Sequence, residues 1–232
     1  MLPSAATPVL VRPRPALSAE EVAVHDRRLA RSGADEIIDW AATTFGSALC
    51  VTTSFADTLL VDLATRVIPD IEVVFLDTGF HFAETLATLR RAMERHELNL
   101  TVLRPDRDGV DRWRGGVDAC CRDRKVALLE RHLVRRAGAW MSGLRREDSP
   151  TRAHTPVVEL DRRGLVKINP IAAWTDLDVE TYRREHDVIV NPLLARGYSS
   201  VGCWPCTVPD RAGESRSGRW AGSDKTECGL HG

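Results

Sequence analysis

Residues 48–76 read ALCVTTSFADTLLVDLATRVIPDIEVVFL, a helix pattern between two strand patterns. Ala48–Thr53 and Ile71–Leu76 are short, apolar and rich in β-branched residues, as buried strands are. Between them, Ala56–Val67 has helical spacing, with its leucines on one face. This order predicts two parallel strands joined by a crossover helix.

The same alternation continues along the chain. His81–His96 and Cys121–Arg136 have helix patterns, whereas Asn99–Leu103 and Ala139–Ser142 have strand patterns. The resulting rhythm predicts an α/β fold in which a parallel twisted sheet carries helices on both faces. Such sheets bind ligands at the carboxyl ends of their strands.

Further elements flank this unit. Ser18–Glu21 has the spacing of a capping box and predicts a helix to about Gly33, with a second helix over Asp35–Phe45. Val157–Leu160 and Leu165–Asn169 flank a polar turn and predict a hairpin. Thr175 and Asp176 are expected to begin a helix that ends at about Asp187.

Length, charge and composition limit the domain organisation and the partners. The chain has 232 residues and a net charge of −1, with dispersed basic residues, which argues against a nucleic-acid partner. We expect a disordered lead-in (1–17), one α/β domain (18–208) and a mobile tail (209–232). The lead-in contains four prolines and lacks the features of a secretory signal, and no apolar run reaches membrane-span length. We therefore expect a cytoplasmic protein without a membrane partner, and the sequence leaves homo-oligomerisation open.

Two cysteine pairs indicate a metal centre. Cys120 and Cys121 are adjacent, and Cys203 and Cys206 form a CxxC motif. Structural disulfides are rare in the cytosol, so these thiols point to metal binding or catalysis. Four thiolates suit zinc or an iron–sulfur cluster. Adjacent cysteines at the start of a helix could each hold a separate iron, which favours [4Fe–4S], although the spacing leaves zinc open.

An alternative interpretation makes Cys203 and Cys206 a redox dithiol and places Cys120 and Cys121 in the core. The CxxC motif lies outside the βαβ context of a thioredoxin motif, and the adjacent pair is flanked by charged residues. Both observations argue against this alternative.

The two remaining cysteines differ in setting. Cys50 lies within the first strand pattern and is interpreted as a small buried hydrophobe. Cys228 lies near the end of the chain, followed by His231, where a flexible arm could deliver a thiolate to a pocket. A C-terminal cysteine does not by itself establish a catalytic role.

Taken together, these motifs resemble the assimilatory adenylyl-sulfate and phosphoadenylyl-sulfate reductases, from about Thr52 to His231. The paired cysteine motifs look like the cluster-bearing branch, which prefers adenylyl sulfate. The connection between Arg104 and Cys120 departs from the family, because it is short and lacks the expected phenylalanine-containing segment. The matching segments are LDTG (76–79), HFAET (81–85), CCRDRK (120–125), SGLRR (142–146), SPTR (149–152), GYSSVGC (197–203), RSGRW (216–220) and ECGLH (227–231).

The resemblance implies a nucleotide site of the PP-loop type after the first strand, where hydroxyls and backbone N–H groups could hold an anion. It implies that Lys125 reaches the sulfate end of the substrate and that arginines grip the phosphosulfate, for which bidentate guanidinium contacts are suited. The implied substrate-binding residues are Thr53, Ser54, Leu76, Asp77, Thr78, Lys125, Gly143, Arg152, Arg216, Arg219 and His231.

The implied activity is thioredoxin-dependent reduction of adenylyl sulfate to sulfite and AMP, through a cysteine S-sulfonate on Cys228. The implied cofactor is a [4Fe–4S] cluster on the four paired cysteines. Reduction of the 3′-phosphorylated substrate, alone or in addition, is the alternative within the family. Outside it stand a PP-loop ATP pyrophosphatase, which the loop without a glycine pair disfavours, and a non-catalytic nucleotide-binding protein held together by zinc.

Overall fold

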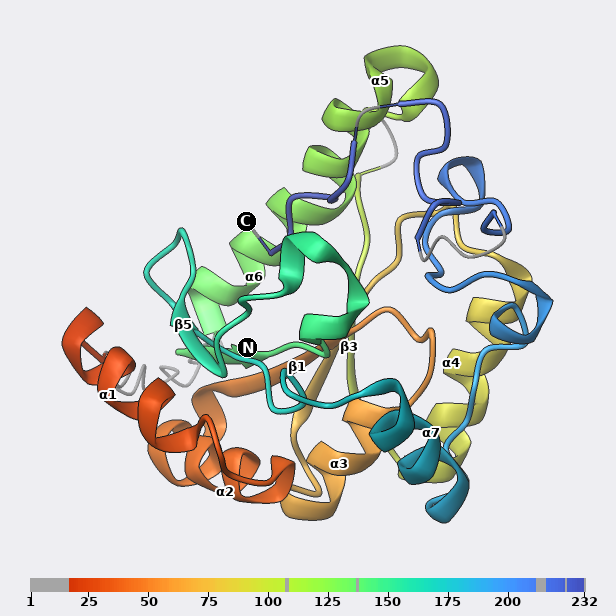
Figure 1. Cartoon of the computed structure of the whole chain (residues 1–232). Coiled ribbons are helices and arrows are strands. Elements are labelled where there is room, and N and C mark those ends of the chain that lie inside the picture. Colours follow the sequence, from red (N-terminus) through yellow and green to blue (C-terminus); the bar gives the residue numbers. More distant parts are fainter. Residues whose placement is uncertain (1–16, 107–108, 137, 212–215, 224, 232) are drawn as a thin grey trace, which may run out of the picture.

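The computed structural model describes residues 17–106, 109–136, 138–211, 216–223 and 225–231. Within these ranges the chain forms a six-stranded sheet with helices on both faces, which confirms the predicted α/β class (Figure 1). The expected lead-in, 1–17, lies outside the described residues except for Leu17, which packs against the core.

The sheet has the strand order β3-β2-β1-β4-β6-β5. All neighbouring pairs are parallel except β5 and β6, which form the predicted antiparallel hairpin. The chain runs outward from β1 to β3 and then returns to place β4 on the other side of β1, so the connections diverge between β1 and β4. Such a switch point opens a crevice at the carboxyl ends of the strands. The strands are β1 (Leu49–Thr53), β2 (Glu72–Leu76), β3 (Asn99–Leu103), β4 (Ala139–Met141), β5 (Val158–Leu160) and β6 (Val166–Ile168).

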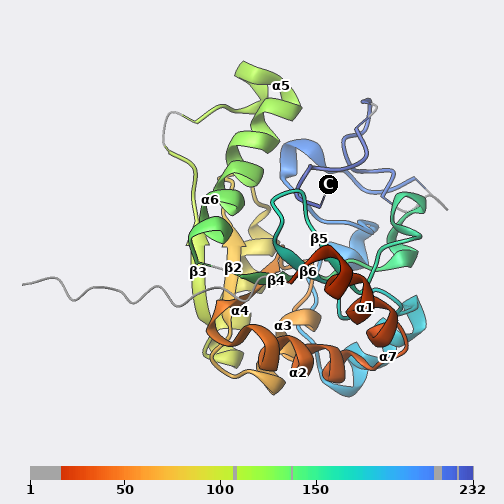
Figure 2. The same ribbon diagram turned by 90° about the vertical axis from the view of Figure 1, so that its left-hand side faces the viewer.

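Alternate strand residues face two separate cores, because successive side chains point to opposite faces of a sheet. In β1, Leu49 and Val51 join the larger core with α2 and α3, whereas Cys50 joins the smaller core under α6. Figure 2 shows α6 on one side of the sheet and α2 and α3 on the other. Cys50 is 1 % exposed, which confirms its interpretation as a buried hydrophobe. The helices are α1 (Ala19–Leu29), α2 (Ala34–Phe45), α3 (Leu59–Val67), α4 (Ala83–His96), α5 (Arg112–Cys121), α6 (Ala127–Arg136) and α7 (Asp176–Glu185).

Helix α3 begins later than the apolar spacing predicts. The expected helix starts at Ala56, but α3 starts at Leu59. Phe55 has a φ of 52°, which breaks the helical path, and the backbone of Ala56 and Thr58 bonds to residues 189–191 instead. A tertiary contact therefore replaces the first helical turn with a loop at the end of β1.

The helix that carries Cys120 and Cys121 begins earlier than predicted. The expected start is Cys121, but α5 begins at Arg112, because the Asp111 carboxylate accepts hydrogen bonds from the N–H groups of residues 113 and 114. A break at Gly116, with φ 76°, follows, and one π-type turn then joins α5 to α6. The cysteine pair thus lies in the interior of a long bent helix, not at its start, which corrects that expectation.

The C-terminal segment returns to the body of the protein, and Figure 1 shows it running beside α5 and α6. The Val208 N–H donates to the Gly218 carbonyl at 3.0 Å. A β-carbon at position 218 would collide with the Val208 backbone, so this close approach requires glycine. Leu230 packs against the smaller core, and Lys225 pairs with Asp118 of α5. No helix in the described ranges is long and apolar enough to span a bilayer.

Candidate active site

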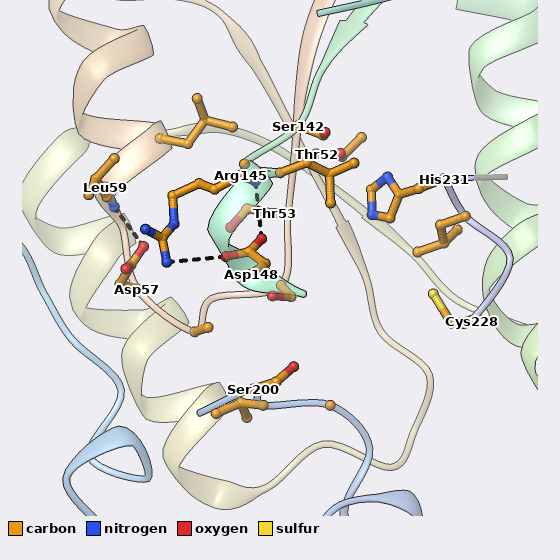
Figure 3. A pocket seen from close by; sticks show the side chains of 18 of the residues that line it. Thr52, Thr53, Asp57, Leu59, Ser142, Arg145, Asp148, Ser200, Cys228 and His231 are labelled. Carbon is orange, nitrogen blue, oxygen red and sulfur yellow. Dashed lines mark hydrogen bonds and ion pairs between the residues drawn. The ribbon is translucent and has the colours of Figure 1, made fainter. Parts of the chain in front are cut away.

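A cavity of about 730 Å³ lies at the carboxyl ends of β1, β2 and β4. Thr52 and Thr53 line it from the end of β1, Leu76 from β2, and Ser142 and Gly143 from the loop after β4. The position agrees with the switch point of the sheet. Figure 3 shows that Cys228 and His231 of the C-terminal segment project into the same space as Thr52 and Ser142.

Most of the substrate-binding residues predicted from the sequence line this single cavity. Asp77 does not: it accepts from Arg104 Nε at 2.9 Å and from the Gly79 N–H at 3.1 Å. Thr78 instead lines a neighbouring small cavity among the cysteines. The predicted residues that line the large cavity are Thr53, Ser54, Leu76, Lys125, Gly143, Arg152, Arg216, Arg219, His231 and the attacking thiol Cys228.

The end of β1 presents two hydroxyls whose hydrogen bonds fix the strand end and the loop that follows it. Thr52 Oγ1 donates to the Met141 carbonyl at 3.2 Å, and Thr53 Oγ1 accepts from the Phe55 N–H at 3.2 Å. Asp57 Oδ1 accepts from the N–H of Leu59, the first residue of α3, at 3.0 Å (Figure 3). This wall of the cavity is therefore polar and locally cross-linked.

Arg152 and Arg216 form the centre of a cationic wall. Arg152 donates from Nε and Nη2 to the two carboxylate oxygens of Glu227, both at 2.9 Å, and from Nη1 to Asp148 at 3.0 Å. Arg216 lies 3.5 Å from the same Glu227 carboxylate. Burial and the nearby Arg152 lower the pKa of Arg216, which shows that positive charge is crowded here.

Arg219 and Lys125 extend this wall. Ser200 Oγ accepts from Arg219 at 3.1 Å and from Arg216 at 3.3 Å, so one hydroxyl orients both guanidinium groups. Gly202 lies against the Arg219 guanidinium, where a β-carbon would come within 2.5 Å of it. Burial lowers the pKa of Lys125, but its electrostatic interaction with Cys203 and Cys228 outweighs burial and leaves that pKa above its ordinary value. Lys125 is thus held charged where the two cavities meet. Cys228 lines the large cavity, and the four paired cysteines line the small one beside it.

His231 is seated over a buried indole. Its ring stacks on Trp140 with centroids 5.8 Å apart and an interplanar angle of 19°. Lys167 and Arg163 lie over the same indole, whose N–H donates to Asp161 at 2.8 Å. Burial, followed by the charge of Lys167, lowers the pKa of His231 well below 6.5, so the imidazole is neutral. Its Nδ1 is buried and has no hydrogen-bond partner in the described part of the chain, which leaves it available to a ligand.

The four paired cysteines line one small cavity beside the large one. Thr78 Oγ1 and Cys203 Sγ are 3.3 Å apart, and Arg112 Nη1 donates to Cys206 Sγ at 3.7 Å. Burial raises the pKa of Cys121 to about 11, in spite of Lys125. A bound metal centre would relieve this cost, because thiolates are the form that binds metals. The donor set therefore fits a soft metal group, although no group of three or more Cys, His, Asp or Glu among the described residues is arranged to hold a single ion.

Comparison with known proteins places the chain in a family. Residues 48–209 match the phosphoadenosine phosphosulfate reductase domain, which is more than half of the chain. The chain belongs to this family. The matched region ends before the segment that carries Cys228.

Curated relatives extend the match over most of the chain. Adenosine 5′-phosphosulfate reductase of Streptomyces coelicolor is 50 % identical, over 89 % of this chain and 91 % of the relative. The enzyme of the same name from Mycolicibacterium smegmatis is 42 % identical, over 88 % and 90 %.

Solved structures agree on the fold. Phosphoadenylyl-sulfate reductase from Candida auris, in a phosphate complex, has a TM-score of 0.73 and 27 % identity, over 83 % of this chain and 98 % of that one. FMN adenylyltransferase of Candida glabrata, with a TM-score of 0.59, 15 % identity and coverage of 84 % and 69 %, shares the fold alone.

Several cavity residues of this family member were not predicted as site residues. Arg145 and Ser200 lie within segments that carry the family resemblance, so their motifs were the available signal. Glu227 directly precedes Cys228, but nothing in the local sequence indicates its contact with Arg152, which lies 75 positions away. Trp140 was assigned only to a strand.

Proposed function

We propose that this protein reduces adenylyl sulfate to sulfite and AMP, with electrons from thioredoxin or a similar dithiol protein. The observation that carries the proposal is the convergence of the Cys228 thiol with Lys125, Arg152, Arg216 and Arg219 in one cavity at the strand ends. A thiol nucleophile beside four cations suits a substrate that is anionic and is attacked at sulfur. The names of the curated relatives support adenylyl sulfate as that substrate.

The cavity has separate places for the two halves of this substrate. The polar loop after β1 and Leu76 form the wall suited to the nucleoside, as at other nucleotide sites of open parallel sheets. The arginines and Lys125 form the wall suited to the phosphosulfate. The Candida auris relative was solved as a phosphate complex, which supports an oxyanion site in this fold.

The chemistry consists of two displacements. In the first, the Cys228 thiolate attacks the sulfur of adenylyl sulfate, a bond from sulfur to Cys228 forms, and AMP leaves with the electrons of the broken S–O bond. The arginines neutralise the charge that builds up on the leaving phosphate. The product on the protein is a cysteine S-sulfonate.

In the second displacement, a thiolate of the reductant attacks Cys228 Sγ and sulfite departs. The second thiol of the reductant then resolves the mixed disulfide and restores the Cys228 thiol. The dithiol therefore supplies both electrons, and its oxidised form is a disulfide. This step needs Cys228 to reach another protein, so we propose that residues 209–232 act as a mobile tail on the 18–208 domain.

We further propose that Cys120, Cys121, Cys203 and Cys206 hold a [4Fe–4S] cluster. The four thiols line one cavity, and the adjacent Cys120 and Cys121 could each hold a separate iron of such a cluster. The cluster would supply a fixed charge and structural order beside Lys125. The six free cysteines suit a reducing compartment, and we accordingly propose a cytoplasmic location.

Sulfite release from adenylyl sulfate and from its 3′-phosphorylated analogue, each with thioredoxin, tests the proposal. We expect the wild-type holoenzyme to favour adenylyl sulfate and Cys228→Ser to release no sulfite from either nucleotide. Preference for the 3′-phosphorylated substrate would reassign the protein within the family. Pyrophosphate release from ATP without sulfite formation would replace the proposal with an ATP pyrophosphatase.

A further inference from the structure

Arg112 connects the two cysteine pairs of the small cavity. It is the first residue of α5, the helix that carries the adjacent pair. Its Nη1 donates to Cys206 Sγ of the CxxC motif at 3.7 Å. Within the described ranges the guanidinium pairs with no carboxylate, so this sulfur is its one hydrogen-bond partner. A cation at a helix N-terminus opposes the helix dipole, so the stability of α5 does not account for this arginine.

We propose that Arg112 is a positioning residue of the metal centre, which holds Cys206 in place as a ligand and ties the CxxC loop to the helix of the adjacent pair. The inference rests on the metal centre proposed above. A ligand thiolate carries negative charge, and a charged donor stabilises it more strongly than a neutral one does. Outer partners of metal ligands orient those ligands, and their removal commonly lowers metal affinity by about 10- to 100-fold.

The backbone that carries Arg112 is fixed by other contacts of the protein. Arg124, in the turn that joins α5 to α6, donates to the carbonyls of Gly109 and Val110 at 2.9 and 2.8 Å. The Asp111 carboxylate then caps α5 directly before Arg112. The guanidinium therefore extends from a rigid position, as a residue that orients a ligand requires.

An aromatic cluster packs the start of α5 against the CxxC loop. The ring centroid of Trp113 lies 6.0 Å from that of Trp204 and 5.4 Å from that of Phe80. Trp204 lies between the two cysteines of the motif, and its backbone N–H donates to the Phe80 carbonyl at 2.9 Å. Both tryptophans are exposed, so this contact forms the outer surface of the loop. It keeps Arg112 within reach of Cys206.

The test measures iron loss and thiol alkylation in the holoenzyme under anaerobic conditions. In Arg112→Gln, iron should pass to excess EDTA about tenfold faster than in the wild type, at the low end of the usual range because the N–S distance is long. Peptide mass spectrometry should show that the initial alkylation rate of Cys206 rises by a similar factor, whereas that of Cys120 stays as in the wild type. Arg112→Lys keeps a charged donor, so both rates should lie between those of Arg112→Gln and the wild type.

Arg114→Gln is the matched control. It removes the same charge from the same helix, but Arg114 is exposed, and its side chain has no hydrogen bond or ion pair in the described part of the chain. Its iron loss and alkylation should equal those of the wild type.

Three results would overturn the proposal: wild-type rates in Arg112→Gln, equal acceleration at all four thiols, or an equal effect of Arg114→Gln. The second would show general loosening of the metal centre, and the third an effect of net charge alone. A wild type without bound iron would refute the metal centre itself, whereas an iron-bound protein that is indifferent to Arg112→Gln refutes this inference alone.

Discussion

Ser200 offers a sharp test of the cationic wall, because one small side chain orients two arginines. Its hydroxyl accepts from Arg219 at 3.1 Å and from Arg216 at 3.3 Å. Hydrogen bonds to charged groups contribute about 1.5–3 kcal/mol each at ideal length, so two long ones contribute about 2 kcal/mol together. Losing that contribution corresponds to a decrease of about 30-fold in kcat/KM. The decrease is about 5-fold if water replaces most of the two lost hydrogen bonds.

Ser200→Ala should therefore lower kcat/KM for adenylyl sulfate about 5- to 30-fold, mainly through a higher KM, as measured by sulfite release with saturating thioredoxin. The change is nearly isosteric, so stability in urea should be unaffected. Ser200→Thr keeps the hydroxyl and should stay within about threefold of the wild type. A Ser200→Ala enzyme with wild-type kcat/KM would show that the arginines do not depend on this acceptor and would refute the reasoning.

Other variants test the metal centre, the buried indole of Trp140 on which His231 stacks, and the docking of the tail. Serine at any of Cys120, Cys121, Cys203 or Cys206 should abolish bound iron, whereas Cys50→Ala should retain it; iron in all four variants would contradict the proposed ligands. Trp140→Phe should lower the free energy of unfolding by about 2 kcal/mol, because the fully buried indole loses its bond to Asp161 while Arg163 still pairs with that carboxylate. Trp113 is exposed, so Trp113→Phe should lower the free energy of unfolding by less than about 0.5 kcal/mol. Equal decreases for the two variants in urea unfolding would contradict a stabilising role for the buried Trp140 indole. The docked tail holds His231 with its pKa below 6.5, so the undocked tail binds more protons, and docking should be complete above pH 6.5 and weaken as the pH falls below it. Amide hydrogen exchange in 225–231, corrected for intrinsic rates, should show this loss in the wild type and not in His231→Gln; a pH-independent wild type would speak against a neutral docked imidazole.

The fold could be predicted where local pattern and tertiary packing agree. Alternate residues of the strand at Leu49–Thr53 pack into two cores, one with α3 and one with α6. Because both faces of this strand are buried, its sequence is a continuous apolar run that can be recognised without the structure. The start of α3 could not be predicted in the same way. The backbone of Ala56 and Thr58 bonds to residues 189–191, and that partner lies too far along the chain for any local signal to show it.

In the candidate site too, residues that belong to local motifs could be predicted, whereas residues that depend on distant contacts could not. Motifs identified the cysteines and arginines as residue types suited to a metal and an oxyanion, and the structure gathers them in two adjoining cavities. Glu227 and Ser200 were not identified, because their roles exist only when the tail returns to the strand ends. The helix that carries Cys120 and Cys121 begins nine residues before the predicted start at Cys121, because the Asp111 carboxylate caps it ahead of Gly115 and Gly116, which are unfavourable in a helix.

The most direct test of the central claim is the chemical state of Cys228 after reaction with adenylyl sulfate in the absence of any dithiol. Mass spectrometry of the holoenzyme should find a stoichiometric sulfonate on Cys228, matched by released AMP, and thioredoxin should then remove it as sulfite. Release of AMP and sulfite with Cys228 unmodified, or with the sulfonate on another cysteine, would contradict the account.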